Sequence, residues 1–532
     1  MPTRPHVLWI TLEDTSPRLG CYGDPVARTP HIDGLAAAGR RYPLAFSTAA
    51  VCSPSRCAVI TGMYATAIGA HHHRTSTTRA DVPDLPTPYA AVPPPYVKTI
   101  PEYLRMAGYY CTNNAKTDYQ FPPPFTAWDA CGRGAHWRQR APGQPFFAVF
   151  NIDMTHESGM WEGDRPVVTD PASVTLPPYL PDTPRTRRAL ARHYDNLAAA
   201  DGRVGEILAQ LEEDGLARDT VVLLWSDHGE GLPRGKSWLY DSGIRVPLIV
   251  RWPGVLQPGE VGHDLVSMID LGPTVLSLAG IPLPCHLQGQ PFLGPAARAR
   301  EYVFAARDRH DEMYDMVRAA RDRRYKYLRN AHPELPYMLW NAYRHRHPVL
   351  QEMWRLHAAD RLDGAARALF APRRAPEELY DTVTDPHELH NLAGDPAHRP
   401  TLQRMRDALA QWREAYGDMG EIPEAQMAAR MWPGGVQPRT AAPVFVSVAE
   451  GHPGLEPAAD GGALRAPALL LLYSATQGAT IAYTCDPGAE ARWHLYTEPL
   501  RLPPGITAIR ARAARIGYAD SEERAVVFTV RG

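Results

Sequence analysis

Polar side chains able to bind a metal or act as acids and bases follow four short apolar segments of this sequence. The segments and the groups after them are Val7–Leu12 with Glu13 and Asp14, Tyr109–Thr112 with Lys116, Phe146–Ile152 with His156, and Val221–Trp225 with Asp227 and His228. Short apolar runs of this length indicate buried strands. Because the carboxyl ends of parallel strands share one edge of a sheet, these groups are expected to converge.

The second chemical feature is a cysteine placed where an anion would bind. In the segment Cys52–Arg56 (Cys-Ser-Pro-Ser-Arg), Ser53 suits an N-cap and Pro54 suits the first helical position. Cys52 is then expected at a helix N-terminus, where backbone N–H groups and the helix dipole favour negative charge. Arg56, one turn further on, points back to the same place.

These residues carry a family resemblance. Cys52–Arg56, followed by Thr61-Gly62, resembles the signature of the formylglycine-dependent sulfatases, in which a maturation enzyme oxidises the cysteine to an aldehyde. Ser226–Glu230 with Lys236 is similar to the family's second metal half-site and its sulfate-binding lysine. Leu379–His387 is similar to a late segment of the family, so the resemblance covers roughly residues 5–420.

Two finer resemblances narrow the comparison. Gly108–Lys116 and Asn151–Glu157 are most similar to the branch that contains heparan N-sulfatase (sulfamidase). Near the C-terminus, Gly478–Tyr483 and Gly517–Ser521 resemble the small β-sandwich appended to chitobiases.

The resemblance and the residue chemistry imply the same site. One divalent cation is expected, calcium with magnesium as the alternative, because carboxylate oxygens dominate the ligand set, namely Glu13, Asp14, Cys52 (as formylglycine), Asp227 and His228. The cations expected to hold the sulfate oxygens are Arg56, Lys116 and Lys236. His156 is expected to protonate the leaving oxygen or nitrogen.

Two positions depart from the family pattern. Asp118 stands where the family commonly has a histidine that orients or deprotonates the formylglycine, so Asp118 is a candidate base. Glu13 stands where an aspartate is more usual, and its longer side chain can still bind the metal.

Three further polar segments were interpreted from composition. The dense polar segment around His310, Asp311 and Glu312 is a candidate substrate-contacting loop. The run His71–His73 does not follow a strand and lacks carboxylate neighbours, which favours a structural or rim position. The basic run Arg318–Arg329 is interpreted as a solvated strand face.

Strands alternating with helices predict an α/β fold, and the resemblance makes it an alkaline-phosphatase-like, mostly parallel central sheet flanked by helices. The expected domains are a catalytic domain over residues 1–299, a smaller α+β subdomain over 300–431 and a β-sandwich over 443–532. A net charge of -2 gives no reason to expect nucleic acid or a membrane as partner. Scattered cysteines and the lack of a signal-like apolar run favour a cytoplasmic location, and the oligomeric state stays open.

The expected function is sulfate release from an O- or N-sulfated sugar, such as a saccharide derived from a glycosaminoglycan. The expected partners are that substrate and a formylglycine-generating maturation enzyme. Two alternatives remain from the sequence: a phosphonate monoester or phosphodiester hydrolase of the same superfamily, and a carbohydrate-binding relative without activity.

Overall fold

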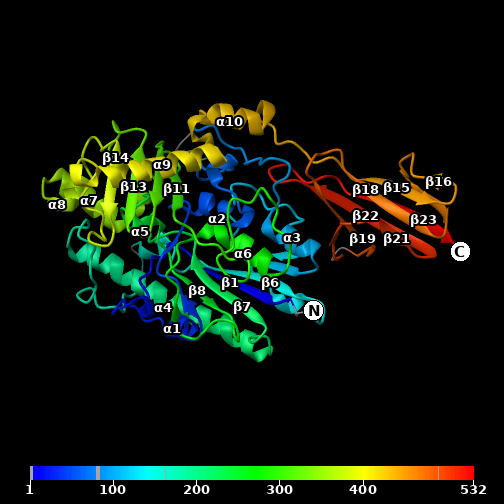
Figure 1. Ribbon diagram of the computed structural model, residues 1–532, viewed down its shortest axis with the longest axis horizontal. Coiled ribbons are helices and arrows are strands. Elements are labelled where there is room, and N and C mark those ends of the chain that lie inside the picture. Colours follow the sequence, from blue (N-terminus) through cyan, green and yellow to red (C-terminus); the bar gives the residue numbers. More distant parts are fainter. Residues whose placement is uncertain (1–3, 79–83, 162, 164, 489–490) are drawn as a thin grey trace.

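The computed structural model describes residues 4–78, 84–161, 163, 165–488 and 491–532 (Figure 1). Its centre is an eight-stranded sheet with the strand order β5-β4-β6-β1-β7-β8-β2-β9. The strands are β5 (Ala130–Cys131), β4 (Tyr110–Asn114), β6 (Phe146–Ile152), β1 (His6–Leu12), β7 (Thr220–Ser226), β8 (Leu248–Arg251), β2 (Arg40–Arg41) and β9 (Glu260–Val261). The strands from β5 to β7 are parallel, and β8 runs antiparallel to both of its neighbours.

Alternate residues of β1 enter two separate hydrophobic cores, one on each face of the sheet. Leu8 and Ile10 pack with α1 (Pro30–Ala37) and with the long helix α4 (Pro184–Glu213). Val7 and Trp9 pack with α2 (Cys52–Thr61), α3 (Ile100–Met106) and α6 (Leu271–Leu278) on the opposite face. A strand covered on both faces has to be apolar throughout, which is why this segment was recognisable in the sequence. The predicted α/β class with helices on both sides is confirmed.

A smaller antiparallel sheet adjoins this body. It consists of β11 (Val303–Arg307), β12 (Val317–Arg321), β13 (Tyr325–Asn330) and β14 (Glu377–Asp381). Helix α9 (Arg399–Tyr416) packs on β12 and β13, and α7 (Pro348–Ala358) packs on α4. The short elements nearby are β3 (Ala45–Phe46), β10 (Val266–Ser267), α5 (Asp241–Ile244), α8 (Gly364–Ala368) and α10 (Glu424–Met431).

The basic run on this sheet is only partly solvated: Arg323, Arg324 and Arg329 are exposed, but its other cations are buried, and for those the interpretation was wrong. Arg318, Arg321 and Lys326 are each at most 3% exposed. Arg318 bonds Asp308 and Asp418, so carboxylates from neighbouring loops neutralise the buried charge.

The C-terminal part forms two further sheets that extend from one end of the molecule (Figure 1). One contains β16 (His452–Pro453), β15 (Val444–Ala449), β18 (Ala468–Tyr473) and β21 (Leu500–Leu502). The other contains β17 (Gly461–Arg465), β23 (Arg524–Arg531), β22 (Gly505–Ala514), β19 (Thr480–Thr484) and β20 (His494–Leu495). Their inward-facing side chains, including Phe445, Leu470 and Phe528, form one core. The domain boundaries at 299, 431 and 443 stay predictions.

None of the helices in the described part of the chain combines the length and the apolarity that crossing a membrane requires.

Candidate active site

The polar groups predicted to converge lie along one edge of the central sheet. In register, Leu12 at the end of β1 is level with Ile152 of β6 and with Ser226 of β7. The residues that directly follow these three strands therefore leave the sheet at the same level. This alignment brings Asp14, His156 and Asp227 into one region, although more than two hundred residues separate the first from the last.

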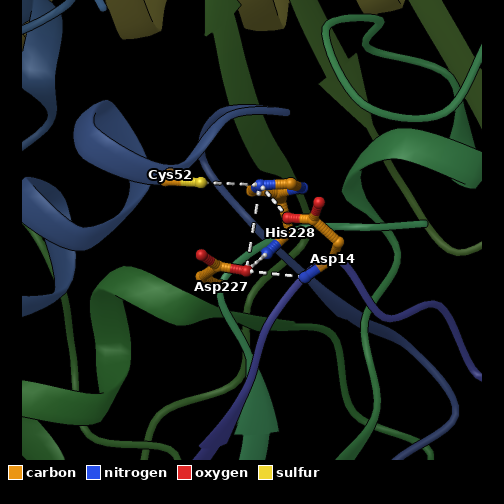
Figure 2. Close-up of side chains that lie close together, drawn as sticks. All are labelled: Asp14, Cys52, Asp227 and His228. Carbon is orange, nitrogen blue, oxygen red and sulfur yellow. Dashed lines mark hydrogen bonds and ion pairs between the residues drawn. The ribbon is translucent and has the colours of Figure 1, made fainter. Parts of the chain in front are cut away.

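The centre of this region is a buried group of four side chains, Asp14, Cys52, Asp227 and His228 (Figure 2). Each offers one ligand atom, and these atoms all lie within 4.8 Å of one another. Nε2 of His228 lies 3.1 Å from Oδ1 of Asp14, 3.8 Å from Oδ1 of Asp227 and 3.3 Å from Sγ of Cys52. All four residues are fully buried.

Helix α2 presents Cys52 to this group. The helix begins at Cys52 itself and Val51 is the N-cap, so the predicted N-cap position of Ser53 was wrong by two residues. Ser55 Oγ donates to the carbonyl of Asp227 at 2.5 Å, and Arg56 Nε donates to Oδ2 of Asp227 at 3.0 Å. These two contacts fasten the first turn of α2 to the end of β7, which fixes Cys52 relative to the carboxylates.

Glu13 lies beside this group and bonds cations. Its Oε1 accepts from Arg56 at 3.2 Å and lies 2.8 Å from Nζ of Lys116. Burial would lower the pKa of Lys116, but Cys52 and Glu13 raise it above its usual value, so the lysine stays charged. Asp118 faces the same lysine at 3.9 Å and has a left-handed backbone φ of 52°.

Lys236 occupies the middle of a second set of polar atoms. Its Nζ lies 2.9 Å from Oδ2 of Asp14, 3.0 Å from Oε1 of Glu157 and 3.4 Å from Nε2 of His156. Asp14, His156 and Glu157 also have ligand atoms close together, but the ammonium group already neutralises their charge. We therefore assign this second set to holding Lys236.

Two residues of this region were missed in the sequence. Glu157 was overlooked although it directly follows His156. Arg344 donates from Nε to Oε2 of Glu157 at 3.1 Å and from Nη1 to the carbonyl of Lys236 at 2.7 Å. The position of Glu157 after β6 was an available signal, whereas nothing in the sequence around Arg344 connects it to this site.

The electrostatics of the four-residue group favour a bound cation. Burial alone would raise the pKa values of Asp14 and Asp227, but Lys236 and His228 hold the pKa of Asp14 well below its usual value, and His228 and Arg56 lower that of Asp227 to about 2. Burial would lower the pKa of His228, yet Asp227 and Asp14 raise it well above its usual value. The two carboxylates thus stay ionised and draw positive charge to the point between them, and these residues fit a divalent metal.

The protonation state of His156 differs from that of His228. Burial, and then the charge of Lys236, hold its pKa below the usual value, so the imidazole is neutral near pH 7. Nδ1 pairs with Ser158 Oγ at 2.8 Å, and Nε2 is the ring atom that faces Lys236.

The segment of His310, Asp311 and Glu312 lies beside His73, which bonds Ser53 of helix α2. The ring of His310 is 1% exposed, 6.1 Å from the ring of His73. Asp311 accepts from Asn341 Nδ2 at 3.1 Å, and Glu312 accepts from the backbone N–H of Ala342. These contacts fasten residues 341–344 over the site. The substrate contact expected of this segment stays a prediction.

Comparisons with known proteins were consistent with this geometry. Residues 5–121 and 132–281 match the protein-family model described as Sulfatase. An ulvan-active sulfatase of Formosa agariphila is 38% identical over 98% of this chain and 91% of its own length. The human N-sulphoglucosamine sulphohydrolase is 28% identical over 77% of this chain and 89% of its own. Among solved structures, a phosphonate monoester hydrolase of Silicibacter pomeroyi superposes with a TM-score of 0.57 at 19% identity, covering 78% of this chain and 96% of its own.

Proposed function

Because the chain belongs to the sulfatase family, we propose that it releases inorganic sulfate from a sulfated sugar through a formylglycine made from Cys52. The observation that carries this proposal is the buried group of Asp14, Cys52, Asp227 and His228, with three cations, Arg56, Lys116 and Lys236, around it. The relatives named for ulvan and for N-sulphoglucosamine support a sugar as the carrier of the sulfate.

The aldehyde form of Cys52 explains turnover better than the thiol does. A thiol that attacked the sulfur atom would keep the sulfo group as a stable adduct. In a hydrated aldehyde, one hydroxyl attacks sulfur and expels the sugar, and loss of the proton from the other hydroxyl then re-forms the aldehyde and expels sulfate. In the structure, Sγ of Cys52 marks the place of one of those hydroxyl oxygens, 3.3 Å from Nε2 of His228.

The metal is proposed to be calcium, with magnesium as the alternative. Asp14, Asp227, His228 and the oxygens of the formylglycine would hold it, and it would offset the negative charge of the sulfate and polarise one of its oxygens. Glu13, also predicted as a ligand, bonds Arg56 and Lys116 here, so its proposed contribution is to position those two cations.

The remaining residues handle the sulfate and the proton. Arg56, Lys116 and Lys236 are fixed by carboxylates and can stabilise the charge that develops on the sulfate oxygens. His156 would protonate the leaving group: a bound sulfate adds negative charge near its ring, which raises its pKa and favours the protonated form. Asp118 is proposed as the base that replaces the usual histidine.

The test is a comparison of substrates with enzyme coexpressed with a formylglycine-generating enzyme. A family member that favours sulfate should turn over an aryl sulfate and a sulfated saccharide faster than an aryl phosphonate or a bis-aryl phosphate. Faster turnover of the phosphonate would support the alternative hydrolase instead, since the shared fold does not distinguish the two. Failure to turn over any of the four would support the inactive carbohydrate-binding relative.

A further inference from the structure

Arg74 is a cation at the active site that the proposed mechanism does not use. Arg56, Lys116 and Lys236 each have a carboxylate oxygen within 3.2 Å. Within the described part of the chain, the guanidinium of Arg74 has no carboxylate partner within ion-pair distance, and the residue is partly exposed. Its charge is therefore available to a ligand.

The backbone holds Arg74 in a fixed position next to the nucleophile. Its neighbour His73 bonds Ser53 Oγ through Nδ1 at 2.7 Å, and the His73 N–H donates to the carbonyl of Arg309 at 2.8 Å. The N–H of Arg74 itself donates to Oε1 of Gln120 at 3.0 Å.

Arg74 keeps this position although its backbone conformation is strained. Arg74 has a φ of 53°, a left-handed conformation that non-glycine residues rarely adopt, and Asp118 and Gln120 in the facing loop have φ values of 52° and 64°. Strain of this kind persists only where the surroundings enforce it, and it clusters at ligand-binding sites.

The side chain extends over the aromatic rim of the site. Its guanidinium carbon lies 5.7 Å from the centroid of the Tyr343 ring, which is 6.4 Å from the ring of His156 and 4.9 Å from that of Trp161. Burial would lower the pKa of Arg74, but Cys52, Asp118 and Asp311 raise it, which agrees with a guanidinium that lies near Cys52. Arg74 thus lies between the reacting centre and rings that can line a sugar pocket.

We propose that Arg74 binds a second anionic group of the substrate, a carboxylate or an additional sulfate on the sulfated sugar or its neighbouring unit. Three other cations already surround the site of the reacting sulfate, so Arg74 is left for a group further out. The planar guanidinium suits two parallel hydrogen bonds to either kind of anion. This inference rests on the proposed function, and it narrows the substrate class to sugars with at least two negative charges.

The experiment compares three glycosides that carry the same reacting sulfate and differ at one substituent: a neutral hydroxymethyl group, a carboxylate or a second sulfate. Wild-type kcat/KM should be roughly tenfold to a hundredfold higher for one of the two anionic glycosides than for the neutral one. The anionic glycoside whose kcat/KM exceeds that of the neutral glycoside by more shows whether Arg74 binds a carboxylate or a second sulfate. Arg74→Gln should make kcat/KM equal for the anionic and the neutral glycosides, mainly by raising KM for the anionic one. Arg74→Lys should restore part of the difference.

Arg346→Gln is the matched control, because Arg346 is exposed and lies 5.8 Å from the Trp161 ring on the same side of the site. It should keep the ratio of kcat/KM between the anionic and the neutral glycosides within about twofold, since one exposed charge in water contributes little. Equal losses in both variants, or a wild-type enzyme that turns over all three glycosides equally, would overturn the inference while leaving the sulfatase proposal standing. No turnover of any glycoside or aryl sulfate would instead defeat the proposed function.

Discussion

At the scale of single residues, His228 links Cys52 to both carboxylates. Its Nε2 faces Cys52, Asp14 and Asp227, while its Nδ1 pairs with the carbonyl of Gly229 at 2.9 Å. A bond from Nδ1–H to that carbonyl leaves the lone pair of the neutral ring on Nε2, where a metal would bind. The proton that the two carboxylates draw onto His228 is thus one that a bound cation would displace.

The negative charge of Asp227 is expected to be essential for metal binding and for activity. Asp227→Asn keeps the size of the side chain but removes one of two buried negative charges, so metal affinity and kcat/KM should both fall, by roughly three orders of magnitude for activity. Metal content by elemental analysis and sulfate release measure the two effects. Asp407→Asn, on the exposed surface of α9, is the control and should match the wild type. Retention of metal and activity in Asp227→Asn would remove Asp227 from the site.

Chelation tests the identity of the metal separately. Dialysis against a chelator should inactivate the enzyme, and calcium should restore activity better than magnesium if oxygen ligands dominate. A histidine in the group also suits transition metals, so manganese and zinc belong in the same titration. Full activity after complete removal of divalent ions would contradict the metal-dependent mechanism.

The proposed conversion of Cys52 to formylglycine predicts both the mass of the intact enzyme and the activity of Cys52 variants. Intact active enzyme should weigh about 18 Da less than its sequence predicts, the difference between cysteine and formylglycine. Cys52→Ala should lose several orders of magnitude in activity, and Cys52→Ser should do the same in a host that cannot mature serine. Cys57→Ala is the matched control: this thiol is also buried in α2, and burial raises its pKa so that it is inert. Turnover at the full rate by the unmodified cysteine form would refute this mechanism.

The sequence predicted those site residues that follow apolar strands and could not predict those that arrive from elsewhere. Asp14 and Asp227 were recognisable because β1 and β7 are mostly apolar and end at Leu12 and Ser226, shortly before these residues. Arg74 comes from an irregular segment and Arg344 from a three-residue helical turn, where neither periodicity nor spacing indicates which side chain reaches the site. The side-chain direction of Glu13 was equally unpredictable, because it depends on two cations from other parts of the chain.

At the scale of elements, apolar strands were predicted well and polar buried strands were not. The bounds expected for β6 are those found, whereas the single strand face expected over Arg318–Arg329 is divided between β12 and β13. Two of the five residues of β12 are arginines, Arg318 and Arg321, yet all five are buried. Ion pairs with distant loops make this burial tolerable, and such pairs leave no local pattern in a sequence.

This explanation of β12 predicts a large loss of stability for one substitution. Arg318→Gln would leave Asp308 and Asp418 buried without their main cation, which should cost about 3–5 kcal/mol in the free energy of unfolding. Arg323→Gln, two residues beyond the strand, removes an exposed pair with Asp264 and should cost at most about 1 kcal/mol. Chemical denaturation of both variants measures the difference. Equal, small losses would show that the buried pairs do not hold this sheet in place.

At the scale of the whole molecule, the C-terminal sheets contact the catalytic part through its side, away from the four-residue group. Lys98 Nζ donates to Thr480 Oγ1 at 2.8 Å, and Arg105 Nη2 donates to the carbonyl of Trp493 at 2.8 Å. Lys98 lies just before α3 and Arg105 lies within it, on the face of the central sheet opposite α4. The resemblance of Gly478–Tyr483 and Gly517–Ser521 to a small β-sandwich indicated these strands, but no feature of the sequence indicated where they dock.

Truncation near Pro438 tests whether this part is an accessory. None of the hydrogen bonds and ion pairs that hold Cys52, Asp14, Asp227 or Lys236 involves a residue after 443 among those described, so turnover of an aryl sulfate should stay within a few-fold of the full chain. The melting temperature should fall by a few degrees, because the surface around Lys98 and Arg105 loses its partner. Size-exclusion chromatography and circular dichroism verify that the shortened protein is folded. Complete loss of activity in such folded protein would mean that the C-terminal sheets help to build the site.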